Sequence, residues 1–471
     1  MYFLKFKKLK LGNLLLYLFF STPLLLNFIS NVINNELENL TFNIFDITSS
    51  LLIFYFLYQI GKQIKLLTKN ITISTGIIVY LFSFYLCNLL VLFFVGDFTF
   101  NVNFLITNIF WIVIFLLKYK NAKPLKQVTL SYLSMIIFNR YLYFLQSKNV
   151  NIFGDVESVF FPISKSIYEN GLKYSLLYPK MGGYPHFMSY LDSLIYKISF
   201  NANDFDFYIS NSILYFWLYF LLVTEIFSSK RLKMFTVSIY FLFLINSSWI
   251  QFLFLTSLMS ERVAGYLFLA LTHVIYKNLD NRNINFIAYF AFGFIYFTKQ
   301  FFILIFLILT FYFIVKAKNK INLIFLFSPL IIDLIAKNSY LSKAPVDSRV
   351  SEIDLQDTIL DLLLGRNLDL KNVNLIFKNL FIDKPFTYIF FLTIIFIIIS
   401  LLIKNRDTFV LLLSSVIFMN IIFTFLLYIS VWRNMELESP IRYLLSTLPI
   451  NLILLTYGIE SINERLSKII S

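Results

Sequence analysis

The chain has 471 residues, of which 59% are hydrophobic and 14% are charged, and its mean hydropathy is +0.76. This composition excludes a water-soluble globular protein and leaves room for many spans of about 20 apolar residues each. The single cysteine, Cys87, excludes an intrachain disulfide. The net charge of +14 is spread over short polar segments. We therefore attribute this charge to membrane topology and expect no nucleic-acid partner.

The apolar runs predict an all-α integral membrane protein with about 14 transmembrane helices (range 12–14). The first run follows a basic N-terminus and has no small-residue cleavage site, so we expect a retained helix. The predicted spans are 11–30, 44–60, 71–95, 102–118, 128–146, 207–228, 234–250, 258–276, 286–299, 300–315, 321–336, 386–403, 408–431 and 443–459.

Charge then fixes the expected orientation. With the N-terminus in the cytoplasm, the segments on that side carry 23 of the 40 Lys and Arg residues and five acidic residues. This asymmetry follows the positive-inside rule. We therefore predict a multi-pass protein of the cell (inner or cytoplasmic) membrane with both termini cytoplasmic. The two longest polar segments, 147–206 and 337–385, become outer loops, and the second contains a predicted amphipathic helix at 351–364.

The first outer loop carries an acidic pair in Gly154-Asp155-Val156-Glu157. Carboxylates next to lipid are costly and mark a functional site by default. Asp155 can act as a general base, and the pair can hold a divalent cation such as Mg²⁺ or Mn²⁺. The alternatives are a helix N-cap for Asp155 and an ordinary first-turn acid for Glu157. Further along the loop, the candidate substrate contacts are Lys180, Tyr184 and His186.

Further candidates fall on the same outer side, namely Glu261, Arg262, Lys299, Arg433 and Arg442. Preorganised cations stabilise a developing phosphate charge, which makes the four basic residues candidate donor-phosphate ligands and Glu261 a substrate contact. The alternatives are a local ion pair between Glu261 and Arg262 and simple snorkelling of Lys299. No nucleotide-binding glycine motif is found, so an activated group would arrive as a lipid-linked donor.

Four motifs, in order along the chain, resemble those of the GT-C superfamily of polytopic glycosyltransferases, of the mannosyltransferase and aminoarabinose-transferase type. The first motif is the acidic pair with a helix ending in Glu169-Asn170-Gly171, and the second is Tyr184-Pro185-His186. The third is Ser260-Glu261-Arg262 followed by Phe297-Thr298-Lys299, and the fourth is Arg442-Tyr443-Leu444 with Pro449. The resemblance implies a GT-C-like helical bundle. It also implies transfer of a sugar from a polyprenyl-phosphate-linked donor to a glycan, lipid or protein acceptor at the outer face.

Residues 1–127 would form an N-terminal four-helix extension, and residues 128–471 the catalytic membrane domain. Asp204 and Asp206 form a D-x-D pattern at a helix entry, where Asp is also common for capping, and His273 fits a helix-packing role. Two other classes stay open. One is a lipid-linked oligosaccharide or O-antigen-type polymerase, and the other is a transporter or flippase without transferase activity.

Overall fold

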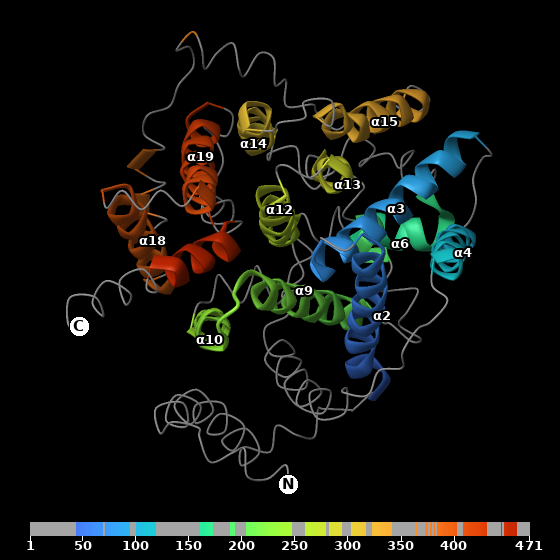
Figure 1. Cartoon of the computed structure of the whole chain (residues 1–471), viewed down its shortest axis with the longest axis horizontal. Helices are drawn as coiled ribbons and strands as arrows, with labels where there is room; N and C mark the ends of the chain where they lie inside the picture. The colour runs from blue at the N-terminus through green and yellow to red at the C-terminus, as the bar shows by residue number, and fades with distance from the viewer. Residues whose placement is uncertain are drawn as a thin grey trace. The chain divides into compact units, whose positions relative to one another are not determined.

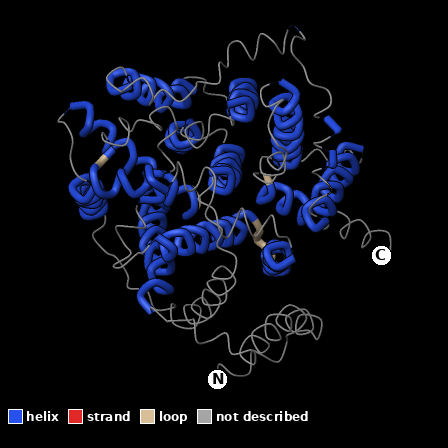
Figure 2. Tube along the Cα trace, turned by 180° about the vertical axis from the view of Figure 1, so that it is seen from behind, coloured by secondary structure: helices blue, strands red, loops and turns tan. Residues whose placement is uncertain are grey.

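The computed structural model describes the following residues, and every structural statement below concerns them: 44–68, 71–94, 100–118, 161–172, 189–193, 204–246, 260–278, 282–293, 303–316, 323–341, 364, 373–374, 377–378, 381, 384–402, 408–430, 444 and 447–458. Nearly all of them are helical and none lies in a strand (Figure 2). Residues 45–471 form one compact unit and residues 1–44 another. Except for Ile44, the elements described here belong to the first of these units.

The helices follow the apolar runs of the sequence (Figure 1). They are α2 (Ile44–Thr68), α3 (Ile73–Phe94), α4 (Phe100–Lys118), α6 (Phe161–Asn170), α9 (Asp204–Ile226), α10 (Lys230–Asn246), α12 (Ser260–Lys277), α13 (Arg282–Gly293), α14 (Ile303–Lys316), α15 (Ile324–Leu341), α18 (Lys384–Leu402), α19 (Thr408–Ser430) and the shorter apolar helix Leu448–Gly458.

The all-α prediction is therefore confirmed for the described residues. Most helices begin and end within a few residues of the predicted bounds, but α2 continues to Thr68 and α15 to Leu341. Two described segments are long and apolar enough to cross a membrane, Ile73–Leu92 and Phe409–Leu426. The predicted spans 11–30 and 128–146 lie outside the described residues. The total of about 14 spans stays a prediction, as does the domain boundary after residue 127.

Helix α3 contacts many of its neighbours. It packs against α4, α9, α12 and α13, and α12 packs in turn against α9 and α13 (Figure 1). Small residues bring α2 and α3 into backbone contact: a Cβ added to Gly76 would stand 2.5 Å from the carbonyl oxygen of Gly61. Glycine at both positions permits this approach, which is characteristic of helix pairs in membranes.

Side-chain hydrogen bonds join α3 to α4. Asn103 Nδ2 donates to Asn88 Oδ1 at 2.6 Å, and Trp111 Nε1 donates to Ser83 Oγ at 2.9 Å. The later residue of α4 pairs with the earlier residue of α3, so the two helices run antiparallel. This is the arrangement that consecutive membrane spans require.

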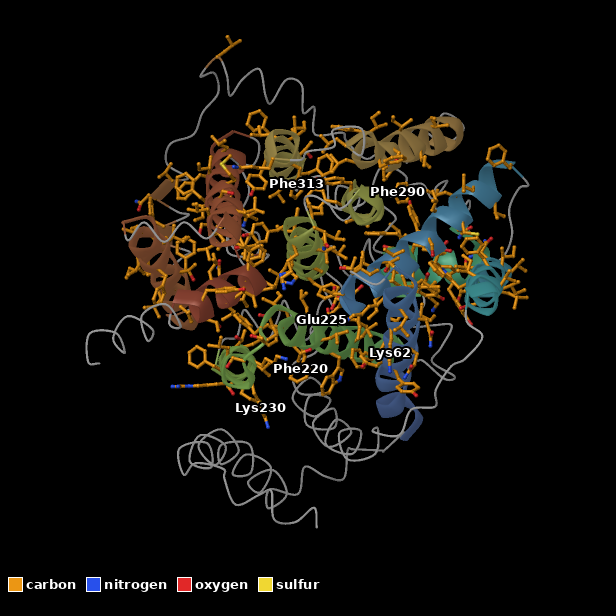
Figure 3. The ribbon with its side chains drawn as sticks, viewed as in Figure 1. Lys62, Phe220, Glu225, Lys230, Phe290 and Phe313 are labelled. Carbon is orange, nitrogen blue, oxygen red and sulfur yellow. The ribbon has the colours of Figure 1, made fainter. Side chains whose placement is uncertain are left out.

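The N-terminus of α3 has a partner for each of its first backbone N–H groups. Glu225, at the end of α9, accepts from the N–H of Ile73 at 2.5 Å and from that of Ser74 at 3.1 Å (Figure 3). The Thr72 hydroxyl accepts from the N–H of Thr75 at 3.1 Å, which is an ordinary N-cap. A carboxylate beside the positive end of the helix dipole is favourable. This contact fixes the register of α9 against α3.

Several helices have a polarity opposite to that of helices in water-soluble proteins. On α4, Asn103 and Thr107 are 0% and 1% exposed, whereas the outward face consists of Val102, Leu105, Ile106, Ile109, Phe110 and Val113. On α18, Thr387 and Thr393 are buried, and the exposed side chains are Phe391, Leu392, Ile395 and Ile398. A surface helix in water shows the reverse pattern, with polar residues outward. This pattern is the one expected of helices in apolar surroundings.

Aromatic contacts join helix ends that the charge pattern assigns to the basic side. The rings of Phe227 and Tyr457 lie 5.0 Å apart, and those of Phe409 and Tyr457 lie 6.3 Å apart. His273, near the end of α12, is buried and packs edge-on against Phe409 at 5.5 Å. This is the helix-packing role expected for His273. The end of α9, the end of α12, the start of α19 and the end of the last helix thus meet.

Candidate functional site

Most of the predicted site residues lie outside the part of the chain that the structure describes. These are Asp155, Glu157, Lys180, Tyr184, His186, Lys299, Arg433 and Arg442. Glu261 and Arg262 fall in the first turn of α12, where only the backbone is described. Asp204 begins α9, the helix entry expected for the D-x-D pattern. The roles assigned to these side chains therefore stay predictions.

Besides the first residues of α9, two pieces of the predicted catalytic loop, 147–206, are described, and the first is α6. This helix packs against α4 and ends at Asn170, directly before the glycine of the Glu-x-Gly motif. The φ of Gly171 is 87°, and its N–H donates to the Ile167 carbonyl at 3.0 Å. This is the left-handed helix cap for which glycine is preferred. Leu172 follows it and is buried.

The second piece, residues 189–193, is a helical segment whose five residues are all buried. The Tyr190 ring lies 4.8 Å from the Phe84 ring and 5.3 Å from the Tyr85 ring, both on α3. The Tyr190 hydroxyl also lies near the side chain of Asn88. This part of the predicted outer loop therefore packs against α3.

A buried carboxylate occupies the same segment. Asp192 is 1% exposed, and its Oδ1 accepts a hydrogen bond from the Tyr215 hydroxyl of α9 at 3.4 Å. Ser193 Oγ donates to the Tyr190 carbonyl at 2.5 Å, and Ser189 is buried beside them in sequence. We call Ser189, Tyr190, Asp192, Ser193 and Tyr215 the Asp192 cluster. It joins the loop to α9 and, through Tyr190, to α3.

The sequence analysis did not single out Asp192. A signal was present, because Asp192 is the one charged residue between Phe187 and Tyr196. An ionisable residue inside an apolar stretch is rare and is normally retained for a function.

No group of three or more His, Cys, Asp or Glu side chains that could hold a metal ion is present among the described residues. The predicted ligands Asp155 and Glu157 lie outside them, so the divalent cation stays a prediction. Cys87, the lone cysteine, is half-buried on α3 close to Tyr190. Within the described residues, the Asp192 cluster is the polar site that includes a buried carboxylate of the predicted outer loop.

Comparisons with family models, with curated proteins and with solved structures give no match to this chain. The function of the chain is therefore inferred from its own residues and contacts.

Proposed function

We propose that the chain is a multi-pass enzyme of the cell membrane. The supporting observation is the reversed polarity of its helices, because side chains such as Leu105 and Ile395 are exposed while Asn103 and Thr393 are buried. In a bilayer the lipid tails cover the apolar faces, and polar side chains turn inward to find hydrogen bonds. The junctions at Glu225 and Phe409 join helix ends that the charge pattern places in the cytoplasm. This agreement supports an outer location for loop 147–206.

We further propose that the enzyme transfers a sugar from a polyprenyl-phosphate-linked donor to a glycan, lipid or protein acceptor at the outer face. The observation that carries this proposal is the docking of the predicted catalytic loop onto membrane helices through residues 189–193. A loop that is only a solvated connection would have no reason to bury a carboxylate and two serines there. A docked loop can instead form the floor of a site beside the lipid.

In the proposed reaction an acceptor hydroxyl oxygen attacks the anomeric carbon of the donor sugar. The bond from that carbon to the phosphate oxygen breaks, and Asp155 accepts the hydroxyl proton. Arg262, Lys299, Arg433 and Arg442 would stabilise the negative charge of the departing polyprenyl phosphate. In the alternative role of Asp155, it would not act as the base but would hold a divalent cation together with Glu157, and that cation would supply positive charge at the phosphate. The four basic residues lie far apart in the sequence, between positions 262 and 442, so this site would draw on several of the predicted spans.

The test compares lipid-linked sugars and surface glycans by mass spectrometry in a wild-type strain, a deletion strain and strains carrying Asp155→Asn or Glu169→Gln. Glu169 is the matched control, because it is an exposed acid of the same loop and the cap of its motif is formed by Gly171, not by the Glu169 side chain. We expect the deletion and Asp155→Asn strains to lack the same sugar and to accumulate the same donor, while Glu169→Gln resembles wild type. If Asp155→Asn resembles wild type while the deletion does not, the assignment of the site fails.

A flippase is the second candidate, and the observation in its favour is also Asp192, because buried carboxylates in helix bundles serve ion-coupled transport. The two functions differ in where the donor collects in the deletion strain. A missing transferase leaves the donor at the outer leaflet, where an impermeant sugar-oxidising reagent reaches it. A missing flippase leaves the donor at the inner leaflet, protected from that reagent.

A further inference from the structure

The Asp192 cluster sits at one end of the loop segment that carries three of the predicted substrate contacts. Leu172 and Ser189, which flank segment 173–188, are 1% and 0% exposed. Gly171 terminates α6 immediately before this segment, and Asp192 follows three residues after Ser189. Both ends of the segment are thus held inside the protein.

We infer that Asp192 is a positioning residue for the predicted catalytic loop. Its carboxylate oxygen receives the Tyr215 hydroxyl and so holds residues 189–193 against α9, while Tyr190 seats the same residues on α3. Segment 173–188, with Lys180, Tyr184 and His186, then starts and ends at fixed points. The effect on catalysis rests on the proposed function, whereas the docking of the loop does not.

Burial of the Asp192 carboxylate carries a free-energy penalty. Burying a carboxylate without hydrogen bonds is strongly unfavourable, and an apolar side chain would pack at this depth without that penalty. A buried, hydrogen-bonded acid instead fixes the orientation of the segment, because the hydrogen bond forms only at one orientation and register of the segment relative to α9. Hydrophobic contacts alone tolerate sliding and rotation of a five-residue segment. Asp192 therefore determines where residues 189–193 lie relative to α9.

Burial also separates this role from direct catalysis. Asp192 is 1% exposed, so a sugar hydroxyl cannot approach it without displacing the surrounding helices. The nearest membrane helices belong to two parts of the sequence, α3 before the loop and α9 after it. Helices α3 and α4, which belong to the predicted N-terminal extension 1–127, thus form part of the surface on which the loop packs. We assign them the role of supporting the loop.

The experiment uses the full-length protein in right-side-out membranes. It compares wild type with Asp192→Leu, Asp192→Asn and Tyr215→Phe. Thr393→Val serves as control, because Thr393 is a buried polar residue of α18, a helix that packs against α10. Two quantities are measured on equal amounts of folded protein: the rate of trypsin cleavage after the predicted outer residues Lys173 and Lys180, and the kcat and KM of donor turnover.

We expect Asp192→Leu and Tyr215→Phe to speed loop cleavage by about fivefold to thirtyfold, the factor set by one hydrogen bond between membrane helices. Donor turnover should fall mainly in kcat, because the donor phosphate ligands are untouched. Asp192→Asn should stay within about threefold of wild type, because its amide oxygen still accepts the Tyr215 hydroxyl. Thr393→Val should leave both quantities unchanged.

If cleavage is as slow in Asp192→Leu as in wild type, the positioning role is overturned. If Asp192→Asn is as impaired as Asp192→Leu, the charge matters and the hydrogen-bond argument is wrong. Failure of the proposed function has a different signature, in which Asp155→Asn turns over the donor normally or wild type does not turn it over. In that case accelerated cleavage in Asp192→Leu would still support the docking role.

Discussion

The contact between Glu225 and the start of α3 gives the sharpest prediction about stability. Glu225→Ala removes the acceptor of two backbone N–H groups, which lie 2.5 Å and 3.1 Å from the carboxylate oxygens. A hydrogen bond to a charged group contributes about 1.5–3 kcal/mol, so the pair amounts to about 3–6 kcal/mol when fully desolvated. Glu225 is only half-buried, and water can replace part of the loss. We therefore expect local opening of the α3 N-terminus to become easier by about 2–3 kcal/mol.

Amide hydrogen exchange measures this opening. A change of 2–3 kcal/mol corresponds to about 30- to 150-fold faster exchange. The acceleration should be confined to Ile73, Ser74 and their immediate neighbours, because Thr72 still caps the N–H of Thr75. Glu225→Gln should show a smaller acceleration, because an amide oxygen accepts one of the two bonds without the charge.

The matched control is Glu169→Ala, which removes an exposed acid from α6 and should leave exchange in α3 unchanged. If Glu225→Ala produces folded protein with wild-type exchange at Ile73 and Ser74, the carboxylate does not cap α3. The proposed register between α9 and α3 would then have to be abandoned.

Three further predictions concern helix packing, each measured as thermal unfolding in detergent. Gly76→Ala places a Cβ 2.5 Å from the Gly61 carbonyl oxygen and should cost about 1–3 kcal/mol through overpacking; an unchanged midpoint would mean that α2 and α3 do not cross there. Asn103→Leu removes the 2.6 Å bond to Asn88 and should cost about 1–2 kcal/mol, and adding Asn88→Leu should then cost less than its effect alone. Gly171→Val forces a β-branched residue into a φ of 87° and should cost about 1–2 kcal/mol, whereas Gly171→Asn should be better tolerated; equal effects would argue against the left-handed cap.

Local features of the structure could be predicted from the sequence where a short window carries the signal. The apolar runs located α3 and α19 within a few residues, and the Glu-x-Gly motif located the end of α6. The prediction that the second helix ends at residue 60 was wrong, because α2 continues to Thr68. Hydropathy falls at Lys62 and Lys65, but lysine is a good helix former. A helix continues past the point where its apolar run stops.

The contacts that organise the bundle could not be predicted in this way. Glu225 caps a helix whose first residue lies 152 positions earlier, and neither sequence window indicates the other. Asn88 and Asn103 stand on helices that look uniformly apolar, and only the packing shows that both face inward. Asp192 gave a local signal, but its partner Tyr215 is one of 30 tyrosines in the chain. Pairings of this kind depend on tertiary structure.

The seat of the loop on α3 also has a consequence for biosynthesis. About 95 residues separate the end of α3 at Phe94 from Ser189. At about 5–20 residues per second, a ribosome completes α3 about 5–20 seconds before it makes the segment that docks on it. In the proposed membrane topology, the translocated loop would therefore meet α3 already inserted in the bilayer. Because α9 follows the loop in the sequence, the loop would reach its seat on α3 first and its hydrogen bond to Tyr215 only after α9 has been made.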